Sequence, residues 1–512
     1  MADSILQHQL EKLAADRYPL HMPGHKRHLA PAPGLSCYAW DMTEIAGADD
    51  LHEADGILAD AMARTAALYG ARRCWYLVGG STVGLLAGIR ALAPFGSEVI
   101  AARNCHKAVY HAIELGRLTA HYLPPPVDTA FGVYGSVPPA AVEAALTAHP
   151  QVKCVILTSP TYEGVLSDIA SIAAICHAHN VPLLVDEAHG AHLPWLPGLT
   201  GAAQAGANAW VQSCHKTLPS LTGTAVLHLR DPEDGPRALR LLRMTQTSSP
   251  NYVLMMSVDD ARAYMEAQGR ERLTAVCAAA DALRAQLPAL GYGDGQAAWG
   301  DTGLEFDPTR LVIRAPQGGE ALDRALAQRG MDVEMHDIHR VVCILTAMDD
   351  GARLARLGEA LREIPPQAGE LPVTAYAQPL PPRRLPPREA ALGQVEWVAL
   401  AQADGRVAAA SAGLYPPGIP LVAPGEMITE QTAAALAQAG PRRDLDLLEV
   451  ELAGALSLGG HLLVAGQARL GLGLAAPGRR AHPLQLVLEA LGELGVLLAL
   501  DLQPLLLGLQ VG

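Results

Sequence analysis

The chain has 512 residues, enough for about three domains at roughly 150 residues each. Half of the residues are hydrophobic, which excludes wholesale disorder, and eight cysteines are too few for a disulfide framework. The net charge of −14 provides no general attraction to nucleic acid or to anionic lipid. This length, composition and net charge favour a cytoplasmic protein that binds small molecules and has neither a nucleic acid nor a membrane as its partner.

The first part of the chain predicts an N-terminal segment followed by a large α/β domain. Residues 1–60 begin without the basic start and apolar run of a secretory signal. In residues 61–258, short apolar runs alternate with Ala- and Leu-rich stretches, a pattern typical of a mostly parallel sheet with flanking helices. The expected strands cover residues 74–78, 98–102, 120–123, 153–158, 181–186, 209–212 and 224–229.

The second half predicts two further folded regions. Residues 259–363 favour a small α+β domain, in which a long helix at 259–290 precedes strands at 305–314 and 339–346 around a helix at 320–329. The remaining regions follow from composition. They are a stiff Pro-rich linker at 364–389, a C-terminal domain at 390–440 and an atypical Leu- and Gly-rich tail at 441–512, which lacks Phe, Tyr and Trp for packing.

Two of the expected strands lead into residues with reactive side chains, a carboxylate and a lysine amine. One strand ends at Asp186, and another runs into Ser213-Cys214-His215-Lys216. Ligands of open α/β sheets bind beyond the carboxyl ends of the strands, so Asp186 and Lys216 are expected at one edge. A pyridoxal phosphate enzyme needs this pair, because its lysine forms a Schiff base with the coenzyme and its carboxylate keeps the pyridine nitrogen protonated. The chain has only five lysines, so few others could serve.

A Gly-rich turn at residues 78–84 could hold the coenzyme phosphate. It links an expected strand to an expected helix at 85–93, and the free N–H groups at a helix start favour an anion. Such a turn alone is a weak signal, but beside the aspartate and lysine it favours a phosphate site. The expected donors are Ser81, Thr82, Ser213 and His215.

Two other interpretations of these motifs fail. Asp186-Glu187-Ala188-His189 spells the DEAH box of helicases, but no G-x-x-x-x-G-K-[ST] loop accompanies it. The pairs His21/His25 and His189/His192 could bind a metal, but the H-E-x-x-H pattern of zinc hydrolases is missing. We therefore expect no metal ion in the site.

Six motifs in order resemble those of the Orn/Lys/Arg decarboxylases, which are pyridoxal-phosphate-dependent enzymes of fold type I. The resemblance runs from about His21 to Glu426 and is to the short bacterial form without an N-terminal wing domain. The motifs are His21-Met22-Pro23-Gly24-His25-Lys26, Asp41-Met42-Thr43-Glu44-Ile45, Arg103-Asn104-Cys105-His106-Lys107, Asp186-Glu187-Ala188-His189-Gly190-Ala191-His192, Ser213-Cys214-His215-Lys216-Thr217-Leu218-Pro219 and Gln246-Thr247-Ser248-Ser249-Pro250.

The resemblance implies a fold, a reaction and roles for particular residues. The fold is a type I large domain with a small α+β domain and a C-terminal domain, assembled as a homodimer or larger even oligomer. The reaction is decarboxylation of arginine, lysine or ornithine to the amine and CO2, for polyamine biosynthesis. Lys216 is the implied Schiff-base lysine and Asp186 the partner of the ring nitrogen. The other implied coenzyme contacts are His106 and Ala188 on the two ring faces, Ser81, Thr82, Ser213 and His215 at the phosphate, and Ser248 and Ser249 at the neighbouring subunit's phosphate.

The residues that handle the substrate are less well defined. His189 or Lys216 would protonate the α-carbon, although His189 could instead be a structural hydrogen-bonding group. A basic substrate side chain requires an acid in a partly dry pocket. We favour Glu426 for this role, and His25 is expected at the entrance. The other candidate acids are Glu44, Asp49 and Glu163, and each could equally be a solvated surface group.

Two other functions stay open at this stage. The first is an aminotransferase or lyase of the same fold; an aminotransferase would hold the substrate α-carboxylate on an arginine, for which Arg314 is the candidate. The second is a non-catalytic protein that binds pyridoxal phosphate without turning over any amino acid.

Overall fold

A computed structural model describes the part of the chain that holds the predicted domains. The described residues are 18–20, 44, 48–128, 133–297, 304–367, 369, 371, 379–414, 419–438 and 447–451. All of them belong to the first of two compact units, residues 1–455. The tail predicted at 441–512 lies outside the described residues except for 447–451.

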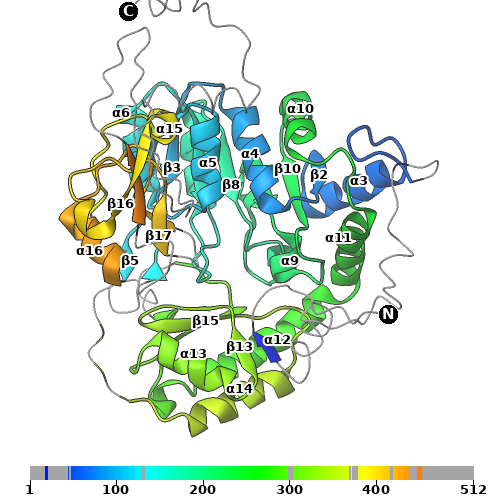
Figure 1. Ribbon diagram of the computed structural model, residues 1–512. Coiled ribbons are helices and arrows are strands. Elements are labelled where there is room, and N and C mark those ends of the chain that lie inside the picture. The colour runs from blue at the N-terminus through cyan, green and yellow to red at the C-terminus, as the bar shows by residue number, and fades with distance from the viewer. Residues whose placement is uncertain are drawn as a thin grey trace, which may run out of the picture. The chain divides into compact units, whose positions relative to one another are not determined.

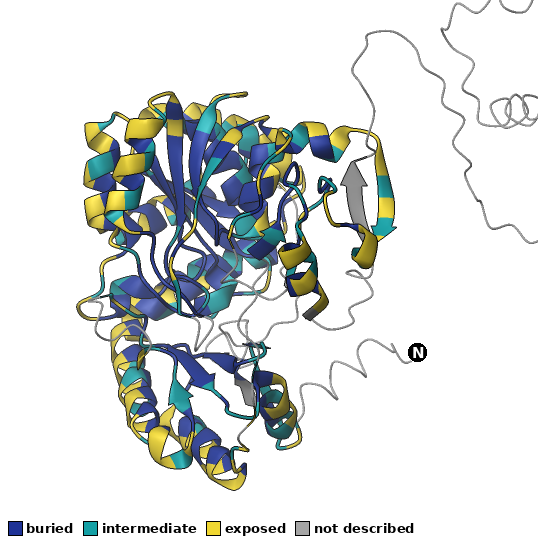
Figure 2. Ribbon diagram, turned by 90° about the vertical axis from the view of Figure 1, so that its left-hand side faces the viewer, coloured by how far each residue is buried: buried dark blue, intermediate teal, exposed yellow. Residues whose placement is uncertain are grey.

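A seven-stranded sheet forms the centre of this unit, in the order β2-β10-β9-β8-β7-β3-β4 (Figure 1). The strands from β9 to β4 are parallel to one another, whereas β10 is antiparallel to both β9 and β2. Helices lie on both sides of the sheet, so its central strands are apolar and buried (Figure 2). The bounds are β2 Arg73–Leu77, β3 Glu98–Ala102, β4 Thr119–Leu123, β7 Val152–Thr158, β8 Leu183–Asp186, β9 Ala209–Gln212 and β10 Ala225–Leu229.

These strands confirm the mostly parallel α/β sheet predicted from the sequence, with ends displaced by at most two residues. Helices connect them, and side chains fix several of the helix starts. Asp168 accepts a hydrogen bond from the N–H of Ser171 at 3.0 Å, and Asn251 accepts one from Leu254 at 3.0 Å. The helices are α3 Ile57–Tyr69, α4 Gly80–Leu92, α5 Lys107–Leu115, α6 Pro139–Ala148, α7 Ile169–Ala178, α8 Ala202–Ala205, α9 Cys214–Thr217, α10 Gly235–Thr245 and α11 Tyr252–Tyr264.

The start of α4 differs from the prediction. The helix begins at Gly80 rather than at residue 85, so residues 80–84 of the predicted Gly-rich loop form the first part of the helix, about one and a half turns. Gly80 has a φ of 72°, which glycine adopts without steric cost, and its N–H donates to the carbonyl of Gly223 at 2.7 Å. Ser81 and Thr82 therefore stand in the first turn, where backbone N–H groups lack partners within the helix.

A smaller antiparallel sheet, in the order β11-β12-β15-β14, lies at the carboxyl-end side of the large sheet (Figure 1). Its predicted first strand is shorter than expected, because Pro308 has no N–H and Asp307 accepts from the N–H of Thr309 at 2.9 Å. The predicted long helix is also divided: a π-helical turn at Met265–Gly269 separates α11 from α12. The bounds are β11 Gly293–Asp294, α12 Arg270–Arg284, β12 Arg310–Arg314, α13 Gly319–Ala327, β13 Met331–Val333, β14 Met335–His336, β15 Arg340–Ile344 and α14 Gly351–Glu363; β1 Tyr18–Leu20 pairs with β13.

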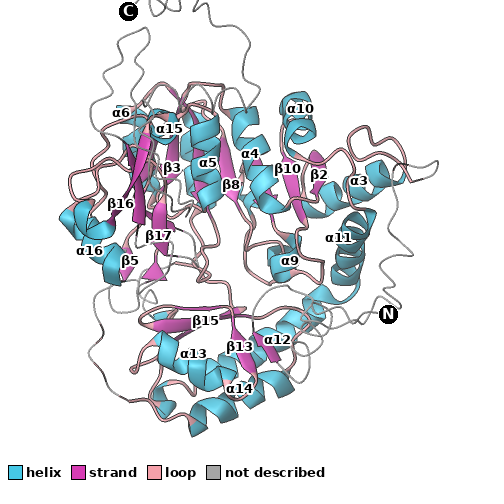
Figure 3. Ribbon diagram, viewed as in Figure 1, coloured by secondary structure: helices cyan, strands magenta, loops and turns pink. Residues whose placement is uncertain are grey.

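The C-terminal part of the unit packs against the large sheet's helices and includes the end of the predicted linker. The N–H of Arg384 donates to the carbonyl of Gly425 at 2.7 Å, and the N–H of Met427 donates to that of Pro382 at 2.8 Å. The segment from 380 to 389 is thus packed and not a free connector, while the domain boundaries stay a prediction. The remaining elements are β5 Val127–Asp128, β6 Val133–Tyr134, α15 Pro387–Leu392, β16 Val395–Ala399, β17 Ala412–Leu414, β18 Ile419–Val422, α16 Glu430–Gln438 and β19 Leu447–Glu451 (Figure 3).

Among the described residues, no helix combines the length and the hydrophobicity that crossing a membrane requires.

Candidate active site

A cavity of about 430 Å³ opens where the parallel strands of the large sheet end. The ends of β7, β8 and β9 and the loop after β3 all contribute to its wall, as expected for an open α/β sheet. Nine of the predicted site residues line it: Lys216, Asp186, His189, His106, Ala188, Ser81, Thr82, Ser213 and His215.

Lys216 and His189 are in direct contact in this cavity. Lys216 Nζ lies 3.0 Å from His189 Nε2. Burial lowers the pKa of Lys216, and burial together with the Lys216 charge lowers the pKa of His189 well below its usual value. Both shifts favour a neutral amine and a neutral imidazole, and a neutral amine is the nucleophilic form.

Arg310 decides which nitrogen of His189 carries the proton. Arg310 Nη2 donates to the carbonyl of His189 at 3.1 Å and lies 3.4 Å from Nδ1 of the same residue. A guanidinium can only donate, so Nδ1 must accept and the proton stands on Nε2, which faces Lys216. Arg310 is itself fully buried and paired with Asp307. This contact could not be predicted from the sequence, because Arg310 comes from the small sheet.

Asp186 ends β8 in a fully enclosed position. Burial raises the pKa of its carboxyl, while the charge of Lys216 and the N–H of Ala188, 3.2 Å from Oδ1, oppose that rise. A cationic ring nitrogen beside this carboxylate would stabilise its ionised form further.

Polar groups gather at the start of α4 and around His215. Ser213 Oγ donates to Ser81 Oγ at 3.3 Å, and His215 Nδ1 lies 3.0 Å from the carbonyl of Thr224, so it donates there and leaves Nε2 for another partner. With the free N–H groups of the first turn of α4, these side chains form a donor set suited to a phosphate. Nearby, the buried Oδ1 of Asn104 has no hydrogen-bond partner among the described residues.

His106 precedes α5 and caps it. Its Nδ1 accepts from the N–H of Ala108 at 3.2 Å, which fixes the ring at the cavity wall. Burial, followed by the charge of Lys216, lowers the pKa of His106 to about 4. The ring is therefore neutral near pH 7, as suits a group that stacks on a cationic heterocycle.

Several wall residues were not predicted. Thr158 ends β7, and Thr161 and Tyr162 follow it, so the rule of strand ends could have found them. Tyr162 contacts His189 edge-on with ring centroids 4.9 Å apart, and its hydroxyl donates to Glu334. The other additional wall residues are Tyr134, Glu334 and Ile419, which come from distant segments and carry no sequence signal.

Glu426, the favoured substrate acid, is not among the residues lining the cavity. Both of its carboxylate oxygens accept from Arg103, at 2.8 Å each, and both side chains are buried. Its charge is thus already paired inside the protein, which disfavours direct contact with the substrate, and the substrate role of Glu426 stays a prediction. Glu163 does line the cavity but is paired with Arg340 at 2.7 Å.

The remaining candidates lie elsewhere. Asp49 accepts from backbone N–H groups at the start of α3, and Glu44 is exposed. Ser248 and Ser249 belong to an exposed loop and do not line the cavity. His25 lies outside the described residues.

Comparison with protein families now identifies the chain. The model described as "Orn/Lys/Arg decarboxylase, major domain" matches residues 15–305, and that of the C-terminal domain matches residues 374–438. The chain belongs to the Orn/Lys/Arg decarboxylase family. As predicted, it is an amino-acid decarboxylase, and its substrate class is the basic amino acids.

Curated relatives of this decarboxylase agree with the assignment. It is 32% identical over 442 residues to an arginine decarboxylase of Bacillus subtilis, covering 82% of this chain and 90% of that protein. It is 32% identical over 434 residues to an arginine decarboxylase of Halalkalibacterium halodurans, covering 81% and 88%. The identity to the constitutive lysine decarboxylase of Escherichia coli is 24%, over 72% and 65% of the two chains.

Solved structures confirm the predicted fold type I architecture of the decarboxylase. Lysine decarboxylase A from Pseudomonas aeruginosa is similar with a TM-score of 0.68 at 21% identity, over 87% of this chain and 81% of that one. The constitutive lysine decarboxylase of E. coli gives a TM-score of 0.65 at 21% identity, over 77% and 73%.

Proposed function

We propose that the chain decarboxylates L-arginine to agmatine and CO2 for polyamine biosynthesis, with pyridoxal phosphate as its coenzyme. The observation that carries the proposal is the meeting of nine predicted coenzyme and catalytic residues at one cavity. We favour arginine over lysine and ornithine as the substrate because two arginine decarboxylases are each 32% identical to this chain over alignments that cover more than four fifths of its length.

The donor set of the cavity suits this coenzyme. Ser81, Thr82, Ser213 and His215 would hold the phosphate, while His106 and Ala188 would lie against the ring. Asp186 would pair with the ring nitrogen, and Lys216 would carry the coenzyme covalently. Asn104 Oδ1, buried without a partner among the described residues, would gain one from a bound polar ligand.

When bound, pyridoxal phosphate supplies an electron sink for the electrons that the departing carboxylate leaves behind. Asp186 would hold the proton at the ring nitrogen of the coenzyme, and its burial would make that charge pair stronger than in water. Arg310 holds Nδ1 of His189 as an acceptor, so His189 presents its Nε2 proton toward Lys216 Nζ. After taking up a proton from solvent, either Lys216 as an ammonium or His189 as an imidazolium delivers a proton to the α-carbon.

Glu334 replaces Glu426 in our proposal for recognising the guanidinium of the substrate. It lines the cavity from the small sheet and accepts a hydrogen bond from Tyr162. Glu163, the other glutamate in the wall, already neutralises Arg340. No arginine is among the described residues of the cavity wall, and Arg314 lies outside it, which disfavours an aminotransferase that clamps the α-carboxylate.

We further propose that the enzyme works as a homodimer in the cytoplasm, with Ser248 and Ser249 reaching the neighbouring subunit's coenzyme phosphate. Their exposed loop leaves them accessible to a second chain. Light scattering would give the mass, and Ser249→Ala should weaken coenzyme affinity only in the dimer.

The deciding experiment compares three substrates. The purified protein with pyridoxal phosphate is incubated with arginine, lysine or ornithine, and CO2, amine and keto acid are measured. Arginine should give the highest kcat/KM and no keto acid. Glu334→Gln should raise KM for arginine by about tenfold, the effect of losing about 1.4 kcal/mol from a charge-assisted contact, whereas the exposed Glu320→Gln should not. Keto acid as the main product would reject decarboxylation, and a preference for lysine would reject arginine.

A further inference from the structure

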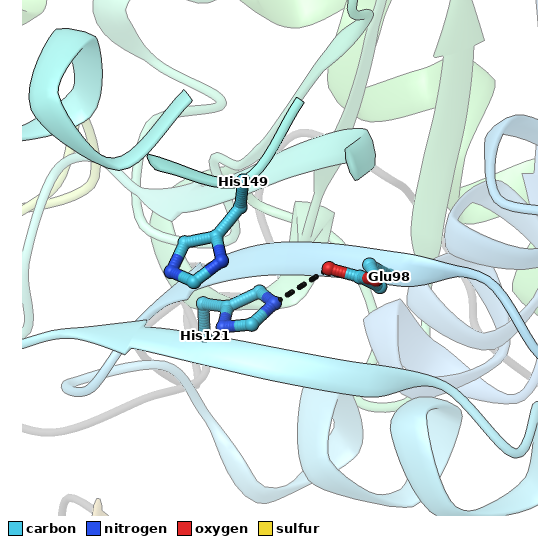
Figure 4. A group of neighbouring side chains, drawn as sticks. All are labelled: Glu98, His121 and His149. Carbon is cyan, nitrogen blue, oxygen red and sulfur yellow. Dashed lines mark hydrogen bonds and ion pairs between the residues drawn. The ribbon is translucent and has the colours of Figure 1, made fainter. Parts of the chain in front are cut away.

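A group of side chains that could bind a metal ion lies away from the cavity. Glu98 is the first residue of β3, His121 lies within the neighbouring β4, and His149 caps the end of α6 (Figure 4). None of the three lines the cavity. Glu98 and the carboxyl end of β3 are separated by four residue steps, or about 13 Å, so the group lies at the opposite edge of the sheet.

The sheet register brings the three side chains together. Ile100 pairs with His121 and Glu98 with Thr119, so Glu98 and His121 project on one face of adjacent parallel strands. His121 Nε2 donates to Glu98 Oε2 at 2.9 Å. The ring of His149 stacks on that of His121, with centroids 3.5 Å apart and planes 16° from parallel. One ligand atom from each residue lies within 4.8 Å of the other two.

These donors match the preferences of a borderline divalent metal. Zn²⁺ binds imidazole nitrogen and carboxylate oxygen at about 2.0–2.2 Å, so tetrahedral ligand atoms stand about 3.3 Å from one another. The Glu98 and His121 atoms are already near that separation. Because the two rings are stacked and nearly parallel, His149 must rotate out of the stack to aim a ring nitrogen at the same ion as His121, and its side chain makes no hydrogen bond to the described residues that would resist this rotation.

We propose that Glu98, His121 and His149 bind one divalent transition-metal cation, for which Zn²⁺ is the appropriate probe. The cation replaces the proton shared by His121 and Glu98, and water fills the fourth position. It fastens β3, β4 and the end of α6 to one another. Its role is stabilisation rather than catalysis, because a cation at this edge of the sheet cannot reach the substrate.

The test titrates Zn²⁺ into the untagged, chelator-treated protein that retains its coenzyme, with calorimetry as the readout. We expect one tight site per chain, a higher melting temperature with Zn²⁺, and a visible ligand-field spectrum when Co²⁺ is used instead. His121→Ala and His149→Ala should each lower the affinity by at least about tenfold. His179→Ala is the matched control, because His179 forms a similar 2.9 Å pair with Glu143 but has no third ligand among the residues that the structure describes.

Decarboxylation should be unchanged in all of these variants. Two variants keep the test valid if His121→Ala does not fold. Glu98→Gln preserves the shape of the side chain, and His149→Ala replaces a residue that is only half-buried. The proposal is overturned if the parent protein binds no Zn²⁺, or if the three ligand variants bind it as tightly as the parent and the control do.

Discussion

Replacement of Glu426 by alanine should loosen the C-terminal part of the unit while leaving the coenzyme residues in place. Arg103 and Glu426 are joined by two 2.8 Å hydrogen bonds, and their side chains are only 4% and 3% exposed. The N–H of Ala423 also donates to Glu426 Oε2 at 2.8 Å. Glu426→Ala would leave the guanidinium buried without its counter-charge.

Breaking one side of a buried ion pair costs about 3–5 kcal/mol. At about 1.4 kcal/mol per factor of ten, local opening of residues 419–438 should become about two to four orders of magnitude more frequent, up to the limit set by global unfolding. Hydrogen exchange followed by mass spectrometry measures this directly. Adding Arg103→Met should recover much of the protection, because no unpaired charge then remains.

Glu430→Ala is the matched control, since Glu430 is exposed on the same segment. Exchange that changes less than about threefold in Glu426→Ala would refute the reasoning. A selective rise in KM for arginine, with unchanged exchange, would instead return Glu426 to the substrate-binding role that the sequence first indicated.

Three further predictions concern the cavity. Asp186→Asn should lower kcat by about 10²–10³ with the coenzyme absorbance retained, because a preorganised charge at the ring nitrogen is lost; near-normal kcat would contradict this role. Arg310→Lys keeps a charge near Asp307 but loses the fork that reaches His189, so kcat should fall by up to about a hundredfold and the pH–rate profile should change; an unaltered profile would exclude control of the His189 tautomer. The pKa of His106 is lowered to about 4 from 6.5, so the unfolded state binds more protons between these values. Stability should fall as the pH drops through that window, by at most about 3 kcal/mol, and His106→Gln should flatten the fall in urea unfolding measured from pH 7 to 4.

The sequence was most informative where burial and strand geometry dominate. The seven strands of the large sheet are buried apolar runs, so their pattern was sufficient to locate them. Asp186 and Lys216 were predicted to lie together because the carboxyl ends of parallel strands meet at one edge of the sheet, and both residues line the cavity there. The start of α4 at Gly80 was harder to locate from the sequence, because the N–H of Gly80 donates to the carbonyl of Gly223, 143 positions away.

Contacts between distant segments could not be predicted. Glu426 was assigned to the substrate because its partner, Arg103, stands 323 positions earlier, and nothing in either motif connects the two. Arg310 and Glu334 were missed for a similar reason, since Arg310 reaches His189, and Glu334 reaches the cavity, only when the small sheet docks beside the large one. Their roles depend on tertiary placement rather than on local pattern.

The composition of the cavity wall also bears on how the chain matures during synthesis. Lys216 leaves the ribosome long before Glu334 and Ile419, which complete the same wall. A nascent chain that ends before Glu334 therefore has the tethering amine but lacks part of the cavity wall. We therefore expect stable binding of the coenzyme only when translation is nearly finished, so that truncated chains would not retain it.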